Sequence, residues 1–143
     1  MSESPPRIPD YSFPGEGLIG EGAYGWVWLG LFKGDQLRAV KVFKPRAIQE
    51  ELWRGEYEKL RALDEPPGVV TLYDAGHTEE GQPYVSMRLM ADRLPQAGGW
   101  RGRTLAQSLL DGGLSTAEGW RLMRETAETL AFVHRNQVRH CDL

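Results

Sequence analysis

The residues best suited to chemistry near the start of the chain are three glycines with the spacing Gly20-x-Gly22-x-x-Gly25. Glycines in this spacing let backbone N–H groups approach phosphate oxygens, because no Cβ stands in the way, and they tolerate positive φ angles. The same spacing also opens dinucleotide-binding folds and occurs in plain hairpins. A dinucleotide site requires a helix directly after the glycines, whereas Trp26 and Val27 begin a β-prone run. The stretch therefore predicts a glycine hairpin between two strands.

A lysine and a glutamate form the second candidate pair. Lys41 lies in a predicted strand, where the two-residue period puts it on the same face as Ala39. Glu56 lies four residues from both Leu52 and Leu60, in the apolar stripe of a predicted helix. An isolated strand lysine is more commonly solvated, but a carboxylate in an apolar stripe is costly to bury unless a cation meets it. We therefore expect Lys41 and Glu56 to contact each other.

The third candidate is the sequence His140-Cys141-Asp142-Leu143. A His-x-Asp-Leu pattern after an apolar helix is typical of the first half of a catalytic loop. The alternative for Asp142 is a polar terminal residue without a role, which the neighbouring His140 disfavours. The histidines and the single cysteine do not have the spacing of a metal site, so we predict no metal ligands.

The elements that must position these residues are expected in the order strands, helix, strands, helices. Strands are predicted on both sides of the glycine turn and over "QLRAVKVF", followed by a helix over residues 47–63. Two more strands are predicted in "VVTLYDAG" and "PYVSMRLM", and a Gly-rich, Arg-containing connection over residues 92–103 follows them. A short helix over 104–110 then precedes a longer one, which opens at Ser115 with a capping box and runs to about residue 136. This order predicts an α+β fold.

Composition limits the classes of function. The 143 residues are 41% hydrophobic and 26% charged, as in one ordinary globular domain. The net charge of −3, without a basic stripe, disfavours nucleic-acid and anionic-lipid partners. Cys141 is the only cysteine, and neither a signal pattern nor a membrane-length apolar run occurs. These features predict a cytoplasmic protein.

With these motifs in order, the chain resembles the opening part of a eukaryotic-type protein kinase, of the kind also found in bacteria. Four motifs match the family in identity, order and spacing. They are the glycine-rich loop "GEGAYGWV" (residues 20–27), the strand lysine in "AVK" (39–41), Glu56 of the mobile helix, and "HCDL" (140–143) of the catalytic loop. The resemblance implies a kinase small lobe, made of a five-stranded antiparallel sheet and one helix, followed by the first helices of an incomplete large lobe.

The resemblance also implies roles for individual residues. The glycine-rich loop would cover the ATP phosphates, Lys41 held by Glu56 would contact the α- and β-phosphates, and Asp142 would accept the proton of a substrate hydroxyl. Met87 would be the gatekeeper of the adenine pocket. The full set of expected nucleotide-contacting residues is Ile19, Gly20, Glu21, Gly22, Ala23, Tyr24, Gly25, Val27, Ala39, Lys41, Met87, Arg88 and Met90.

Two departures from the family qualify this expectation. Cys141 replaces the arginine that pairs with a phosphorylated activation loop in the family, so an active state would be reached without that switch. The 143 residues also end before the family's metal-binding asparagine and Asp-Phe-Gly sequence. We therefore expect ATP as the cofactor and Mg²⁺ only in a complete domain. Because phosphoryl transfer needs Mg²⁺, we expect little or no turnover by this chain.

Three functional interpretations remain open. The first is the ATP-binding part of a kinase that phosphorylates protein Ser/Thr hydroxyls, with a flexible lead-in over residues 1–12, a small lobe over 13–91 and a hinge-following part over 92–143. The second is a non-catalytic module that docks on a partner through an exposed helical stripe, formed by Trp120, Met123, Ala127 and Leu130. The third is a broken gene product without a function of its own.

Overall fold

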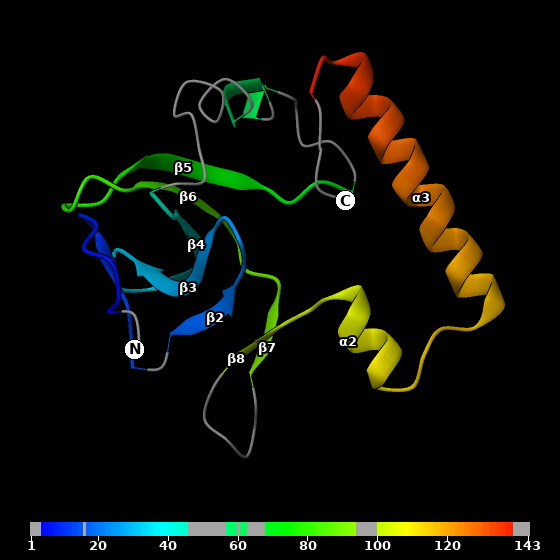
Figure 1. Cartoon of the computed structure of the whole chain (residues 1–143), viewed down its shortest axis with the longest axis horizontal. Helices are drawn as coiled ribbons and strands as arrows, with labels where there is room; N and C mark the ends of the chain where they lie inside the picture. The colour runs from blue at the N-terminus through cyan, green and yellow to red at the C-terminus, as the bar shows by residue number, and fades with distance from the viewer. Residues whose placement is uncertain are drawn as a thin grey trace. The chain divides into compact units, whose positions relative to one another are not determined.

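A computed structural model describes residues 4–15, 17–45, 57–59, 61–62, 68–93 and 100–138 of the chain. The chain divides into two compact units. The first unit comprises Met1–Ile48 and Leu72–Arg103, and the second comprises Gln49–Thr71 and Thr104–Leu143. The first unit contains the sheet and the second contains the long helix (Figure 1).

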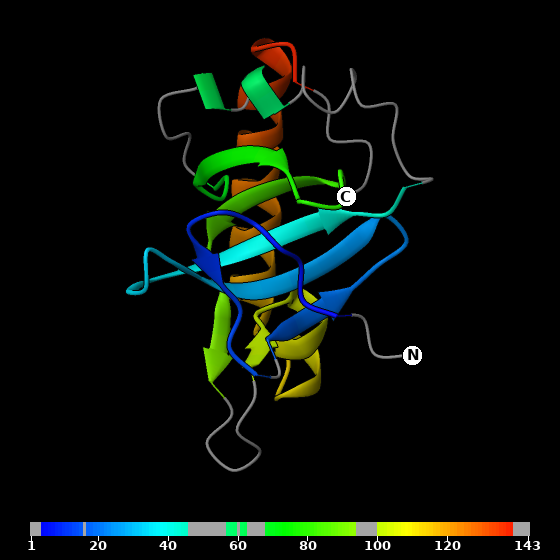
Figure 2. The same ribbon diagram turned by 90° about the vertical axis from the view of Figure 1, so that its left-hand side faces the viewer.

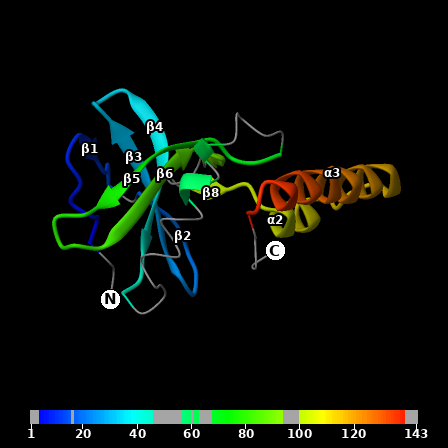
Figure 3. The same cartoon turned by 90° about the horizontal axis from the view of Figure 1, so that it is seen from above.

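The first unit is built on an antiparallel sheet whose described strands follow the order β1-β3-β4-β6-β5, with β2 also paired to β3 (Figure 1). Seen from above, the strands twist progressively across this sheet (Figure 3). The five predicted strands are confirmed, and a two-residue strand β1 joins them. Their bounds are β1 Tyr11–Ser12, β2 Leu18–Glu21, β3 Gly25–Phe32, β4 Gln36–Phe43, β5 Leu72–His77 and β6 Pro83–Arg88.

The central strands β3 and β4 are paired without a bulge from Gly25↔Phe43 to Phe32↔Gln36. Their tight connection uses positive φ angles at Lys33 (50°) and Gly34 (84°), a conformation that glycine adopts without steric cost. β4 also pairs with β6 along Arg38↔Arg88 to Val42↔Tyr84. β4 is thus hydrogen-bonded on both edges and lies in the middle of the sheet.

A hydrophobic cluster covers the outer face of the sheet, which is the face of Trp28, Val40 and Val42. Ile8, only 5% exposed, completes this cluster from the N-terminal segment. That segment crosses the strands in Figure 2. Residues 1–12 were expected to form a flexible lead-in, but the described part of that segment packs on the sheet. The physical reason is that the exposed outer face of Trp28 and the valines needs an apolar cover.

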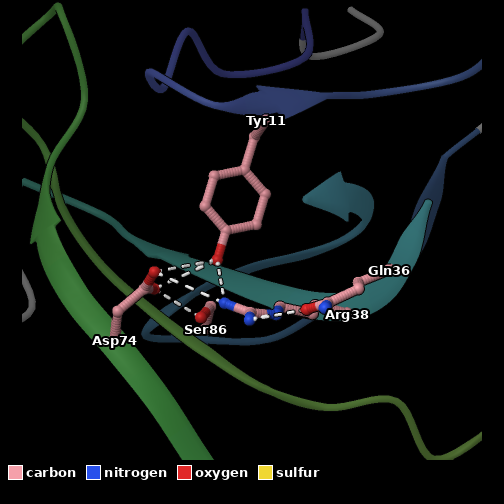
Figure 4. Close-up of polar contacts among 5 residues, drawn as sticks. All are labelled: Tyr11, Gln36, Arg38, Asp74 and Ser86. Carbon is pink, nitrogen blue, oxygen red and sulfur yellow. Dashed lines mark hydrogen bonds and ion pairs between the residues drawn. The ribbon is translucent and has the colours of Figure 1, made fainter. Parts of the chain in front are cut away.

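A polar network fastens β1 to the same outer face (Figure 4). The Tyr11 hydroxyl lies 3.1 Å from both carboxylate oxygens of Asp74, to which it donates, and accepts a hydrogen bond from Arg38 Nη1 at 3.1 Å. The Ser86 hydroxyl also donates to Asp74, and Arg38 Nη2 donates to Gln36 Oε1 at 3.0 Å. Burial raises the pKa of the Tyr11 hydroxyl, so it stays protonated and remains a donor. The network therefore ties three strands to the N-terminal segment.

The predicted connection over residues 92–103 contains two short strands that the sequence analysis missed. β7 (Ala91–Arg93) and β8 (Trp100–Gly102) pair as an antiparallel hairpin in the register Ala91↔Gly102 to Arg93↔Trp100. Strands of three residues are too short to show a hydrophobic period, and the sequence between them is rich in Gly and Pro. β8 lies beside β2.

The second unit contains helices α2 (Leu105–Leu110) and α3 (Thr116–Arg135). α3 begins with the predicted capping box, in which the Ser115 hydroxyl accepts from Glu118 N at 3.2 Å and the Glu118 carboxylate accepts from Ser115 N at 2.8 Å. Of the helix predicted over residues 47–63, residues 57–59 and 61–62 are helical and the others lie outside the described residues. Within the described part of the chain, no helix has the length and apolarity needed to cross a membrane.

Candidate functional site

The candidate site lies on the inner face of the sheet, opposite the Ile8 cluster. In β4, Ala39 and Lys41 share this face, as the two-residue period predicts. The strand register places Val27 opposite Lys41, and Met87 opposite Ala39, so these four expected site residues lie together on one face. Ala39 is buried, whereas the other three are half-buried. The sheet thus offers an apolar surface with one ammonium group on it.

The glycine-rich loop is the turn between β2 and β3. Gly22 N donates to Gly25 O at 2.9 Å and closes the loop. Gly25 is required by close packing, because a Cβ there would collide with the carbonyl oxygen of Val42 in β4. Nothing lies within 4 Å of the Cβ positions of Gly20 and Gly22, so the loop backbone is open to an approaching ligand. None of these three glycines has a positive φ angle, so the loop does not need glycine for its backbone conformation. The missing Cβ atoms remain as the reason for glycine at these positions.

An ion pair that the sequence analysis did not predict holds the base of this loop. Lys44 Nζ lies 2.8 Å from Glu21 Oε1 and 4.9 Å from the centre of the Trp26 ring. The Lys44 amide also donates to Tyr24 O at 2.9 Å. The hydrogen bond from Lys44 lowers the pKa of Glu21, so this carboxylate is charged at neutral pH. Glu21 is therefore occupied in bracing the loop, while the neighbouring side chain of Tyr24 is exposed at its tip.

The charged candidates are described only in part. The Lys41 ammonium lies 5.2 Å from the centre of the Phe43 ring, on the inner face of the sheet. Glu56 lies outside the described residues, so its predicted contact with Lys41 stays a prediction. His140, Cys141 and Asp142 also lie outside them, and so does any geometry of the predicted catalytic loop.

The segment after β6 carries the remaining expected residues. Arg88 ends β6, and Met90 follows two residues later with its carbonyl oxygen accepting from Arg103 N at 3.0 Å. Ile19, expected in the roof of the adenine pocket, lies in β2 beside the β7–β8 hairpin, where a Cβ on Gly102 would be 3.8 Å from its Cγ2. The expected residues of the loop, the sheet face and this segment therefore belong to one compact unit.

This arrangement is suited to an anionic ligand with an apolar base. The Lys41 ammonium supplies donors that phosphate oxygens accept, and the missing Cβ atoms of Gly20 and Gly22 leave room for a phosphate beside the loop backbone. Val27, Ala39 and Met87 supply the apolar surface. Among the described residues no group of three or more His, Cys, Asp and Glu side chains could hold a metal ion.

Comparison with known proteins identifies the family and the fold of the chain. A family model of the protein kinase domain matches residues 13–143. The kinase domain of PknI from Mycobacterium tuberculosis has a similar fold, with a TM-score of 0.68 at 22% identity over 94% of this chain and 52% of that chain. A double mutant of that domain gives a TM-score of 0.72 at 21% identity, over 100% of this chain and 55% of that chain. A search of curated proteins gives no match.

The present chain thus spans about half the length of the solved kinase domains that it matches. The match of the family model covers the strands β2 to β8 and the helices α2 and α3. The α+β architecture is that of a kinase small lobe followed by the start of a large lobe. The chain belongs to the protein kinase domain family.

Proposed function

We propose that this chain is the ATP-binding part of a protein kinase that transfers the γ-phosphate of ATP to Ser/Thr hydroxyls of proteins. The observation that carries the proposal is the common inner face of Val27, Ala39, Lys41 and Met87 below an open glycine loop. In this proposal residues 13–91 form the nucleotide-binding lobe in the cytoplasm, and residues 92–143 form the connection and the first helices of the large lobe.

Each part of the site has a distinct task in this proposal. Gly20, Gly22 and Gly25 cover the phosphates, and Lys41 contacts the α- and β-phosphates while Glu56 orients its ammonium. The backbone of residues 88–90 hydrogen-bonds the adenine edge. Asp142 accepts the proton of the substrate hydroxyl.

Mg²⁺ would neutralise the phosphate charge during transfer, and residues 1–143 contain no Asp-Phe-Gly to hold it. In this proposal a polypeptide of these 143 residues does not phosphorylate a protein substrate, although Lys41 and the glycine loop are still present to bind ATP. ATP-dependent phosphorylation by this chain that disappears in Asp142→Asn would contradict this part of the proposal.

The binding step is tested by calorimetric titration of ATP into the 143-residue chain and two lysine variants. Lys41→Met removes the ammonium of the site and should weaken ATP binding by about tenfold or more, which corresponds to about 1.4 kcal/mol. Lys33→Met removes the same charge from the exposed turn between β3 and β4, and should leave the affinity within about twofold. Equal affinities of wild type and Lys41→Met would overturn the proposed nucleotide site.

A second candidate function is a non-catalytic module that docks on a partner through α3. The exposure of Trp120 (68%) and Met123 (65%) on one side of α3 favours it, because large apolar side chains at a monomer surface often mark an interface. Sedimentation of wild type and the double variant Trp120→Glu with Met123→Glu tests whether this surface associates. Concentration-dependent association that the variant loses, in a chain that does not bind ATP, would favour docking over the kinase proposal.

A further inference from the structure

The β7–β8 hairpin contacts the candidate nucleotide site at two points. At the first, the carbonyl oxygen of Met90 accepts a hydrogen bond from the backbone N–H of Arg103 at 3.0 Å, which extends the pairing of the hairpin by one residue. At the second, Gly102 approaches Ile19 of β2, and Ala91, paired with Gly102, is 8% exposed. The hairpin is therefore anchored to both the segment after β6 and the first strand of the glycine hairpin.

The first anchor uses a backbone group that a purine base could otherwise reach. In an extended segment, the backbone groups of residues two apart point to the same edge. Where residues 88–90 face the adenine edge, as the proposed ATP site requires, the carbonyl of Arg88, the N–H of Met90 and the carbonyl of Met90 would follow one another as acceptor, donor and acceptor. The adenine edge offers the 6-amino donor and the N1 acceptor in the complementary order, with only a C–H at position 2.

The second acceptor in this series is already used inside the protein. A ligand that donates to the Met90 carbonyl would have to share it with the Arg103 N–H or displace it, and displacement would leave a backbone donor without its partner. An adenine loses nothing by this arrangement, because it has no donor at position 2. A base with an amino group at position 2 gains nothing from its extra donor.

We propose that the β7–β8 hairpin is a specificity element of the nucleotide site, which restricts the segment 88–90 to one acceptor and one donor by bonding the Met90 carbonyl. This inference rests on the proposed ATP site and deepens it. The site accepts bases with the two-point pattern of adenine, and it gives no additional affinity to bases such as 2-aminoadenine that carry a third group, a donor at position 2. Arg103 is a positioning residue in this arrangement and acts through its backbone N–H.

The test compares two nucleotides, ATP and 2-amino-ATP, in three forms of the 143-residue chain. Arg103→Pro removes the N–H that bonds Met90, and the preceding Gly102 already lies in a strand, which is the conformation favoured before proline. Arg103→Ala keeps the N–H and removes only the side chain. Calorimetric titration of each form with each nucleotide gives the ratio of the two dissociation constants.

In wild type and Arg103→Ala the two dissociation constants should agree within about twofold. In Arg103→Pro the released carbonyl can accept the 2-amino group, so 2-amino-ATP should bind about five to ten times more tightly than ATP. A ratio in Arg103→Pro equal to that of wild type would overturn the proposal for the hairpin while leaving the ATP site standing. Absence of binding of both nucleotides to wild type would overturn the proposed function itself.

Amide hydrogen exchange in the wild-type chain supplies a readout that does not depend on the proline variant folding. The Arg103 amide should be protected in the free chain and should stay protected when ATP or 2-amino-ATP is bound. Loss of that protection on addition of 2-amino-ATP would mean that the ligand displaces the internal bond. That result would also overturn the assignment of the hairpin as a specificity element.

Discussion

Replacing Ile8 by alanine should strongly destabilise the sheet although Ile8 lies outside every predicted strand. Ile8 is 5% exposed and packs against Trp28, Val40 and Val42, none of which is more than 4% exposed. The substitution removes about three buried carbon atoms, which at ~0.8 kcal/mol each amounts to about 2.4 kcal/mol of lost transfer free energy. Since both valines lie on the doubly paired strand β4, the cavity cannot collapse fully. The expected loss is therefore about 2–4 kcal/mol.

Urea denaturation followed by tryptophan fluorescence measures this loss, and Trp28 in the same cluster reports on it directly. The matched control is Leu37→Ala, because Leu37 lies on β4 but is 45% exposed. Leu37→Ala should lower the free energy of unfolding by less than about 1 kcal/mol. A loss of less than about 0.5 kcal/mol for Ile8→Ala, or a loss equal to that of the control, would refute the assignment of the N-terminal segment to the core.

Three further substitutions test the loop and the long helix. Gly25→Ala should lower the stability of the sheet by about 2 kcal/mol or more in the same urea assay, because its Cβ would collide with the β4 backbone. Lys44→Met should raise the pKa of Glu21 toward its usual value, measured by carboxyl NMR titration. Because the pKa is lowered in the folded chain, the ion pair contributes above the ordinary pKa of glutamate, and this contribution is lost as the pH falls through the lowered value. Ser115→Ala removes the N-cap and should lower the stability of α3 by about 1 kcal/mol, as measured by amide hydrogen exchange. The control Thr126→Ala lies within the helix and should not lower its stability.

The parts of the fold that depend on residues close together in the sequence could be predicted. β4 was recognised by its alternation, and the start of α3 by the Ser-x-x-Glu capping box, because both signals lie within a few residues. The glycine hairpin was separated from a dinucleotide site by the β-prone residues that follow it. The shared face of Ala39 and Lys41 followed from the strand period alone.

Contacts between distant segments could not be predicted in the same way. Ile8 stands alone among prolines and polar residues, so no period identifies it as a core residue. Gly30 gave no signal either, although a Cβ there would lie 3.1 Å from the Tyr11 ring and 3.3 Å from the Phe13 ring. The pairing of Glu21 with Lys44 likewise depends on how the glycine hairpin folds back on β4. These features become visible only when the sheet is assembled.

The two faces of β4 carry different groups of residues. Lys41 and Ala39 point to the inner face with the other residues that match the kinase motifs, whereas Arg38 and Val40 point to the outer face. On that outer face Arg38 bonds Tyr11 and lies 3.5 Å from Asp74, so the N-terminal segment is tied to the strand that carries the site lysine. Because β4 is paired on both edges, a change in the outer contacts cannot be absorbed by that strand alone and must reach its neighbours β3 and β6. The described part of the N-terminal segment is therefore part of the structural support of the candidate site.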